Sequence, residues 1–314
     1  MTYRSEPPSD SGPCTPLLRK AQEVELPSRM SLRQYLWSEV DTDYVTAPLM
    51  AFCFMTGFID AISFTAVFVW CGFQTGNFAQ IALAFARMTG GHKFGFTLAD
   101  GQAVVSLIAF NLGAFIGRIG DRVGPQTRAW LFSGTLVQAI FILIAGICIQ
   151  QSGQDSVAIG RGVPSWTSEL TTVGLALMAA SLGLQGIMGK RLNTHFSTTV
   201  VLTAMWVELV TDPHLFRMRS KVASRDHKVF ALVTMFTGAY AARLLVGQFG
   251  AAATLGFGAG LRLVVAAAWL FVRGKGEGYS RLWDDEPSLD AFGSEADAFA
   301  LPPEVPSYGA VSTA

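Results

Sequence analysis

The chain alternates long apolar stretches with shorter polar ones. From residue 46 onward, eight apolar segments follow one another: 46–70, 76–89, 98–118, 128–149, 169–189, 197–210, 229–248 and 251–272. Six of them contain about 20 residues, which is enough for an α-helix to cross a hydrocarbon core of roughly 30 Å. The pattern predicts an all-α, polytopic helical membrane protein with about eight hydrophobic helices, two of them short.

The apolar segments also fall into two halves that resemble each other. The bounds of these halves are 45–150 and 168–272. Gly57 and Gly183 lie 126 residues apart, and Gly113 and Gly238, each followed by an alanine and an aromatic residue, lie 125 apart. The two short segments occupy corresponding places. Several matches at nearly one spacing predict an internal repeat, although each match alone is weak.

Lys and Arg concentrate on the side that carries both tails, whether eight segments cross the membrane or the two short ones re-enter and only six cross. Because cytoplasmic loops are enriched in Lys and Arg, both termini are expected in the cytoplasm. The protein is then an integral, multi-pass protein of the plasma membrane or an endomembrane. Four crossings per half make the repeats parallel, and three make them inverted. We favour eight crossings, since a short helix with polar caps nearly spans a thinned bilayer.

Composition further limits the class of protein and the ligands that it could bind. Hydrophobic residues make up 51% of the chain and charged residues 15%, whereas an ordinary soluble domain has about 25% charged residues. The net charge is zero and no basic domain stands out, so nucleic acid is not an expected partner. The four cysteines are scattered, and no motif of a hydrolase, metalloprotease or P-loop enzyme is present. We therefore expect no metal, no cofactor and no enzymatic activity.

The two tails differ from the membrane region. Residues 1–44 form a polar N-terminal tail whose first part is rich in Pro and Ser and is expected to be disordered. Residues 30–44 place apolar side chains at helical spacing, which predicts an amphipathic helix. That helix lies either on the membrane surface or against the protein's own loops. Residues 273–314 form an acidic tail without periodicity, expected to be disordered.

One carboxylate, Asp60, lies inside the first apolar segment. An ionisable residue within a membrane helix is costly and often functional, so Asp60 is a candidate site for a proton or a solute. The alternative is a structural role, in which Asp60 pairs with Arg118 or Arg243 or is a protonated, hydrogen-bonded acid. These two arginines also fall near helix ends, where long side chains reach the interface.

A polar group of residues opens each short segment. In the first half these residues are Gln74, Thr75, Gly76 and Asn77; in the second half they are Thr198 and Thr199, preceded by Gln185 in the neighbouring helix. A helix that begins within the membrane must satisfy its free backbone N–H groups locally, either by its own cap or by a ligand. Paired short segments at matching positions mark the binding site of many transporters. The alternative is close helix packing through small residues.

The motifs around the first short segment resemble those of the YoaK-like family, a group of bacterial and fungal membrane proteins known mainly as a domain of unknown function. The matching residues are Gly57, Asp60, Ala61 and Phe64, then Thr75-Gly76-Asn77, and later Gly183, Gln185 and Thr198-Thr199. The lead-in LRQYLWSEVDTD resembles the start of fungal members. The family usually has a TG pair where this chain has Thr199-Val200. The resemblance implies the fold over residues 32–272, but no substrate.

Together these patterns predict a small-molecule transporter or channel-like carrier, whose partners are the lipid bilayer and an unknown small solute. In this hypothesis the site lies at Thr75-Gly76-Asn77, and Asp60 couples to a proton. The alternative is a membrane scaffold or receptor that acts through its tails. A homo-oligomer is compatible with either function.

Overall fold

The computed structural model describes residues 31–90, 95–160, 163–192, 202–216 and 222–275. Residues 1–30 and residues 276–314 of the acidic C-terminal tail lie outside these ranges, as do Thr198 and Thr199. Within them the chain is helical, and its only β-type pairs are isolated bridges.

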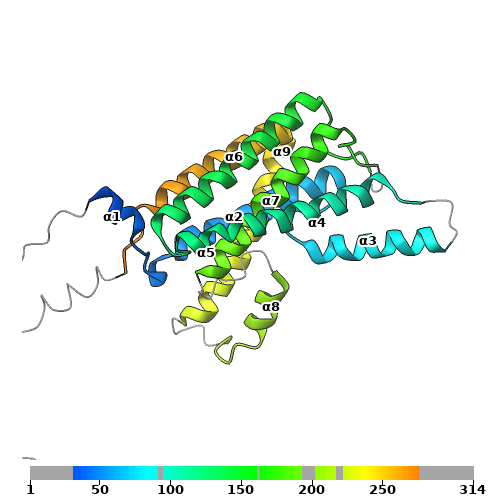
Figure 1. The fold of residues 1–314 in the computed structure, drawn as a ribbon. Coiled ribbons are helices and arrows are strands. Elements are labelled where there is room, and N and C mark those ends of the chain that lie inside the picture. Colours follow the sequence, from blue (N-terminus) through cyan, green and yellow to red (C-terminus); the bar gives the residue numbers. More distant parts are fainter. Residues whose placement is uncertain (1–30, 91–94, 161–162, 193–201, 217–221, 276–314) are drawn as a thin grey trace, which may run out of the picture.

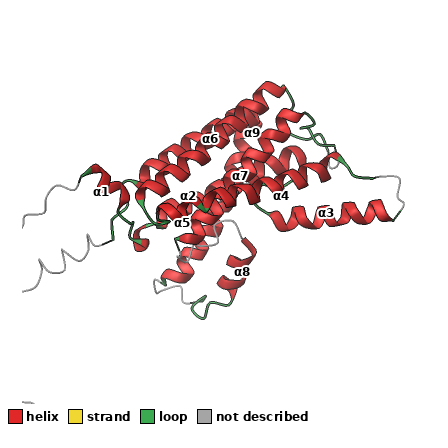
Figure 2. Cartoon of the chain, viewed as in Figure 1, coloured by secondary structure: helices red, strands yellow, loops and turns green. Residues whose placement is uncertain are grey.

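Long apolar helices form the body of the protein (Figures 1 and 2). By length and composition, five helices of the described part could cross a membrane. They are α2 (Thr46–Val67), α4 (Leu98–Gly117) with its continuation α5 (Ile119–Val123), α6 (Arg128–Ser152), α7 (Glu169–Arg191) and α9 (Ala223–Trp269). Each covers an apolar segment expected from the sequence, which confirms a polytopic helical membrane protein.

Helix α9 covers the seventh and eighth apolar segments, because it turns back at Gly250. There φ is 80° and ψ is 169°, a conformation that glycine adopts readily. The Ser156 hydroxyl accepts a hydrogen bond from the Ala251 N–H at 2.8 Å. We call residues 223–249 the first arm of α9 and residues 251–269 the second arm. The second arm returns beside α6, where Trp269 donates to Thr135 at 3.1 Å (Figure 1).

The two short segments form α3 (Gln74–Thr89, 16 residues) and α8 (Leu202–Val210, 9 residues). Helix α3 begins beside the middle of α4, where Gln74 donates to Ser106 at 3.2 Å. It ends beside the start of α4, where Arg87 pairs with Asp100 at 2.5 Å. The described part of α8 is only about 13 Å long at 1.5 Å per residue. Neither helix is among the five candidate membrane helices of the described part, and the start of the segment at 197–210 lies outside the described residues, so the number of crossings stays a prediction.

Two helix crossings depend on glycine. A Cβ on Gly57 would lie 2.0 Å from the Met235 carbonyl oxygen of the first arm of α9, and one on Gly238 would lie 2.1 Å from the Phe54 oxygen of α2. The α4–α7 crossing repeats this arrangement. There a Cβ on Gly113 would lie 2.0 Å from the Ala180 oxygen, and one on Gly183 would lie 1.9 Å from the Phe110 oxygen. Small residues of this kind let membrane helices approach closely.

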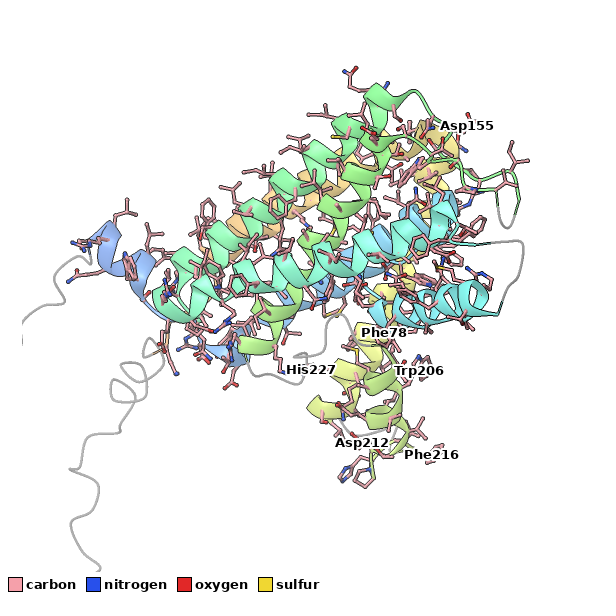
Figure 3. All side chains as sticks on the ribbon, turned by 45° about the vertical axis from the view of Figure 1, so that its right-hand side comes forward. Phe78, Asp155, Trp206, Asp212, Phe216 and His227 are labelled. Atoms are coloured by element: carbon pink, nitrogen blue, oxygen red, sulfur yellow. The ribbon has the colours of Figure 1, made fainter. Side chains whose placement is uncertain are left out.

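Large apolar side chains cover the outside of the bundle. Figure 3 shows Phe78 on α3 and Trp206 on α8; these side chains are 66% and 52% exposed. Phe115 and Phe236 on α4 and α9 are exposed to a similar degree. An apolar exterior around a bundle of this length is typical of helices that face lipid.

Both ends of the described chain meet at one end of the bundle. Helix α1 (Leu32–Trp37) ends early because residues 39 and 40 form bridges with Thr127 and Gly274. The expected amphipathic helix over 30–44 is therefore a single short helix followed by extended chain and a 3-10 turn, η1 (Thr42–Tyr44). Tyr35 donates to the Leu270 carbonyl, so one side of α1 packs on the protein itself. Leu32 and Trp37 remain exposed.

Candidate functional site

The chain after α2 turns back into the bundle. Phe68 adopts a left-handed conformation, with φ of 59°, and ends the helix. Residues 69–73 then run back alongside α2, because a Cβ on Gly72 would lie 3.3 Å from Thr56 in the middle of that helix. We call residues 68–73 the re-entrant segment. Non-helical backbone at such a depth is tolerated only where protein or a cavity surrounds it.

Asp60 holds the deepest part of this segment. One carboxylate oxygen, Oδ1, accepts hydrogen bonds from the backbone N–H groups of Cys71 and Gly72, at 2.8 and 2.7 Å. The second oxygen, Oδ2, has no hydrogen-bond partner among the described residues. Asp60 therefore satisfies two backbone donors and keeps one carboxylate oxygen for a proton or another group.

Asn77 and Gln74 hold the other side of the segment. The Asn77 side chain accepts from the Trp70 N–H at 3.2 Å and donates to the Trp70 carbonyl oxygen at 2.6 Å. Gln74 donates to the Cys71 carbonyl oxygen at 2.6 Å, and both amides donate to the Ser106 hydroxyl at 3.2 Å. These side chains bind the protein's own backbone in the way a capped helix start requires.

The remaining residues of the first polar group lie differently. Thr75 is exposed on the outer surface, and the Phe73 ring covers Gly76, where a Cβ would lie 2.7 Å from the ring. The structure thus brings Asp60, Gln74 and Asn77 together around the re-entrant segment and leaves Thr75 outside it. Their counterparts Thr198 and Thr199 lie outside the described residues.

A second polar cluster occupies the interior where α2, α6, α7 and the second arm of α9 meet. Arg262 is completely buried and donates to the side-chain oxygens of Gln138 and Gln185, the latter at 2.9 Å. Gln185 in turn donates to the Thr56 hydroxyl at 2.8 Å and to the Phe52 carbonyl oxygen at 3.0 Å. We call these residues the central cluster.

Thr56 joins the two polar regions. Thr56 lies one helical turn before Asp60 in α2. Its hydroxyl accepts a hydrogen bond from Gln185, and its methyl group lies near Gly72 of the re-entrant segment. Thr56 therefore links the re-entrant segment, which is held by the half-buried Asp60, to the buried guanidinium of Arg262 through Gln185. Sequence reasoning identified Asp60 and Gln185 but overlooked Arg262, whose charge within an apolar segment was the available signal.

The two arginines considered as partners of Asp60 lie elsewhere. Arg118 is exposed at the end of α4 and lies over the Phe115 ring at 5.4 Å, and Arg243 is exposed on the first arm of α9. Neither has a carboxylate within ion-pair distance in the described part of the chain. The described residues also contain no group of three His, Cys, Asp or Glu side chains that could hold a metal ion.

Comparison with known proteins gives one match. A family model described as "Protein of unknown function (DUF1275)" matches residues 49–268, which include both polar regions. No curated protein and no solved structure matches the chain.

Proposed function

The chain belongs to the DUF1275 family of proteins of unknown function. We propose that this protein is a secondary carrier for a small solute. The observation that supports this proposal best is the re-entrant segment. It places unwound backbone and the start of α3 in the middle of the bundle, next to the half-buried carboxylate of Asp60. Interrupted helices at this depth are the usual way in which carriers build a binding site.

The glycine crossings add a second argument, because they relate the two halves of the chain. Helix α2 of the first half packs on the first arm of α9, and α7 of the second half packs on α4 in the same way. The glycines involved are the pairs that the sequence comparison matched. We propose that α3 and α8 re-enter and that three helices of each half cross; the repeat is then inverted, an arrangement that supports alternating access in many carriers.

In this proposal Asp60 carries the coupling proton on its free oxygen, Oδ2. The neighbouring titratable side chain is Cys71, which lies in the re-entrant segment itself. Gln74 and Asn77 act as positioning residues, since their amides are engaged with the backbone of Trp70 and Cys71. The solute then contacts the segment and the adjoining central cluster, while the exposed Thr75 has no part in the site.

Solute flux into liposomes tests this function. The full-length protein is reconstituted, uptake of a panel of labelled small solutes is measured, and internal pH is followed with a dye. We expect at least one solute to enter faster than into empty liposomes, with proton movement that Asp60→Asn abolishes. Thr65→Val, a change on the same helix that removes only a bond to the Ala61 carbonyl, is the matched control. Equal uptake by protein-containing and empty liposomes for every solute would contradict the proposal.

We further propose that the end of the bundle that carries both chain ends faces the cytoplasm. Lys and Arg of the described residues gather at this end: Arg33, Arg118, Arg122, Arg128, Lys190, Arg191, Arg273 and Lys275. The opposite end carries Asp155 (Figure 3) and the ion pair of Arg87 with Asp100. The positive-inside rule supports the assignment. Reporter fusions at the C-terminus should be active in the cytoplasm, and an active external reporter would reverse the orientation.

A further inference from the structure

Arg262 is a buried cation without a buried anion beside it. Its side chain is 0% exposed, and its hydrogen-bond acceptors among the described residues are the neutral amide oxygens of Gln138 and Gln185. Its Nε–H group is buried without a partner, and no carboxylate of the described residues lies within ion-pair distance. An unpaired charge inside a membrane protein is costly and is rarely retained without a use.

The surroundings do not otherwise compensate this charge. Both glutamines present oxygen atoms to the guanidinium, and their own NH₂ groups donate elsewhere, Gln185 to Thr56 and Gln138 to the Met188 sulfur at 3.1 Å. Gln138 and Gln185 are thus held with acceptors facing Arg262. The donors left over in the cluster belong to the guanidinium.

We propose that Arg262 is the binding residue for a small monocarboxylate, an inference that rests on the proposed carrier function and names its class of solute. The edge of a guanidinium that contains Nε presents two parallel N–H groups, and these match the two oxygens of a carboxylate. One fixed positive charge balances one negative charge, which favours a monoanion over a polyanion. One turn earlier on the same helix, Gly258 packs against Phe58 and Met55, so an apolar surface adjoins the charge.

The position of Arg262 agrees with a solute site. The residue lies where helices of both halves meet, and Gln185 and Thr56 connect it to the re-entrant segment. A bound carboxylate there would contact elements that must move relative to each other during alternating access.

Direct binding of radiolabelled acetate to the purified full-length protein in detergent tests this inference. We expect saturable binding that excess unlabelled acetate displaces and that equal ionic strength of sodium chloride does not. Arg262→Gln should abolish binding. Arg262→Lys, which keeps the charge but loses the two-pronged geometry, should weaken it by about tenfold, the equivalent of one charge-assisted hydrogen bond.

Arg243→Gln is the matched control, because Arg243 lies exposed on the other arm of the same helix. It should bind acetate like the wild type. If Arg262→Gln does not fold, the decision rests on Arg262→Lys. The monocarboxylate site is refuted if the wild type shows no saturable acetate binding, or if Arg262→Lys binds acetate as tightly as the wild type. Neither result would affect the carrier function, which solute flux and its dependence on Asp60 test separately. Acetate binding without any flux would instead refute the carrier function.

Discussion

The contact between Asp60 and the re-entrant segment supports a quantitative prediction. Replacing Asp60 with alanine leaves the N–H groups of Cys71 and Gly72 without an acceptor. Each buried, unsatisfied donor costs about 1–3 kcal/mol, so the segment should be destabilised by roughly 2–6 kcal/mol. Asparagine keeps an oxygen acceptor but loses the charge, and should cost about 1 kcal/mol per bond, or about 2 kcal/mol in total.

Thiol labelling can measure this opening, because Cys71 lies in the segment and is buried. A variant is made in which Cys71 is the only cysteine, by replacing Cys14, Cys53 and Cys148. A destabilisation of about 2 kcal/mol raises the open population about thirtyfold, so Asp60→Asn should label with a maleimide about thirty times faster than the parent. Asp60→Ala should label at least as fast.

The control for the labelling experiment is a substitution at Thr65, which lies on α2 like Asp60. Thr65→Val should leave the labelling rate of Cys71 unchanged, because the hydroxyl bonds only to its own helix. If Asp60→Ala labels Cys71 no faster than the parent protein, the carboxylate does not hold the re-entrant segment and the reasoning fails.

Three further predictions concern packing and turns. Gly238→Val should separate the first arm of α9 from α2, because a Cβ at this position would lie 2.1 Å from the Phe54 oxygen. We expect it to lower the thermal unfolding temperature in detergent more than the control Gly247→Val, which lies at an exposed position. Gly250→Ala should destabilise the protein by about 1–2 kcal/mol, because its φ of 80° suits only glycine; guanidinium or SDS unfolding measures this cost. Asn77→Ala removes all contacts of that amide with Trp70 and should make the region near α3 more susceptible to proteolysis, whereas a wild-type digestion pattern would show that the contacts contribute little.

The sequence predicted most of the helices because apolar segments long enough to cross a membrane are unmistakable. It also indicated that the first short segment could re-enter, but it placed the end of the first apolar segment at residue 70, whereas α2 ends at Val67. Phe68, Val69 and Trp70 are apolar and the first glycine follows only at position 72, so these three residues resemble a continuation of α2. What stops the helix is a set of distant contacts, above all with Asp60 and Asn77.

Contacts between residues far apart in the sequence also explain another difference between the predicted and the observed structure. The early end of α1 results from bridges to Thr127 and Gly274, which no local pattern reveals. Asp60 was identified as a candidate because a charge within an apolar segment is conspicuous. Arg262 carried the same signal, but the geometry was needed to show that it is completely buried and that no carboxylate of the described residues pairs with it.

Helices of the first half pack on helices of the second half, and this arrangement has a consequence for how the protein is made. Helix α2 enters the bilayer early in synthesis, but the surface that receives it belongs to α9, which the ribosome completes last. Until then the groove at Gly57 stays open to lipid, and the nascent chain is an incomplete assembly. A premature stop before α9 therefore removes the docking surface of the first helix, and the cell's quality control should treat such a product as unassembled rather than as a slightly shorter protein.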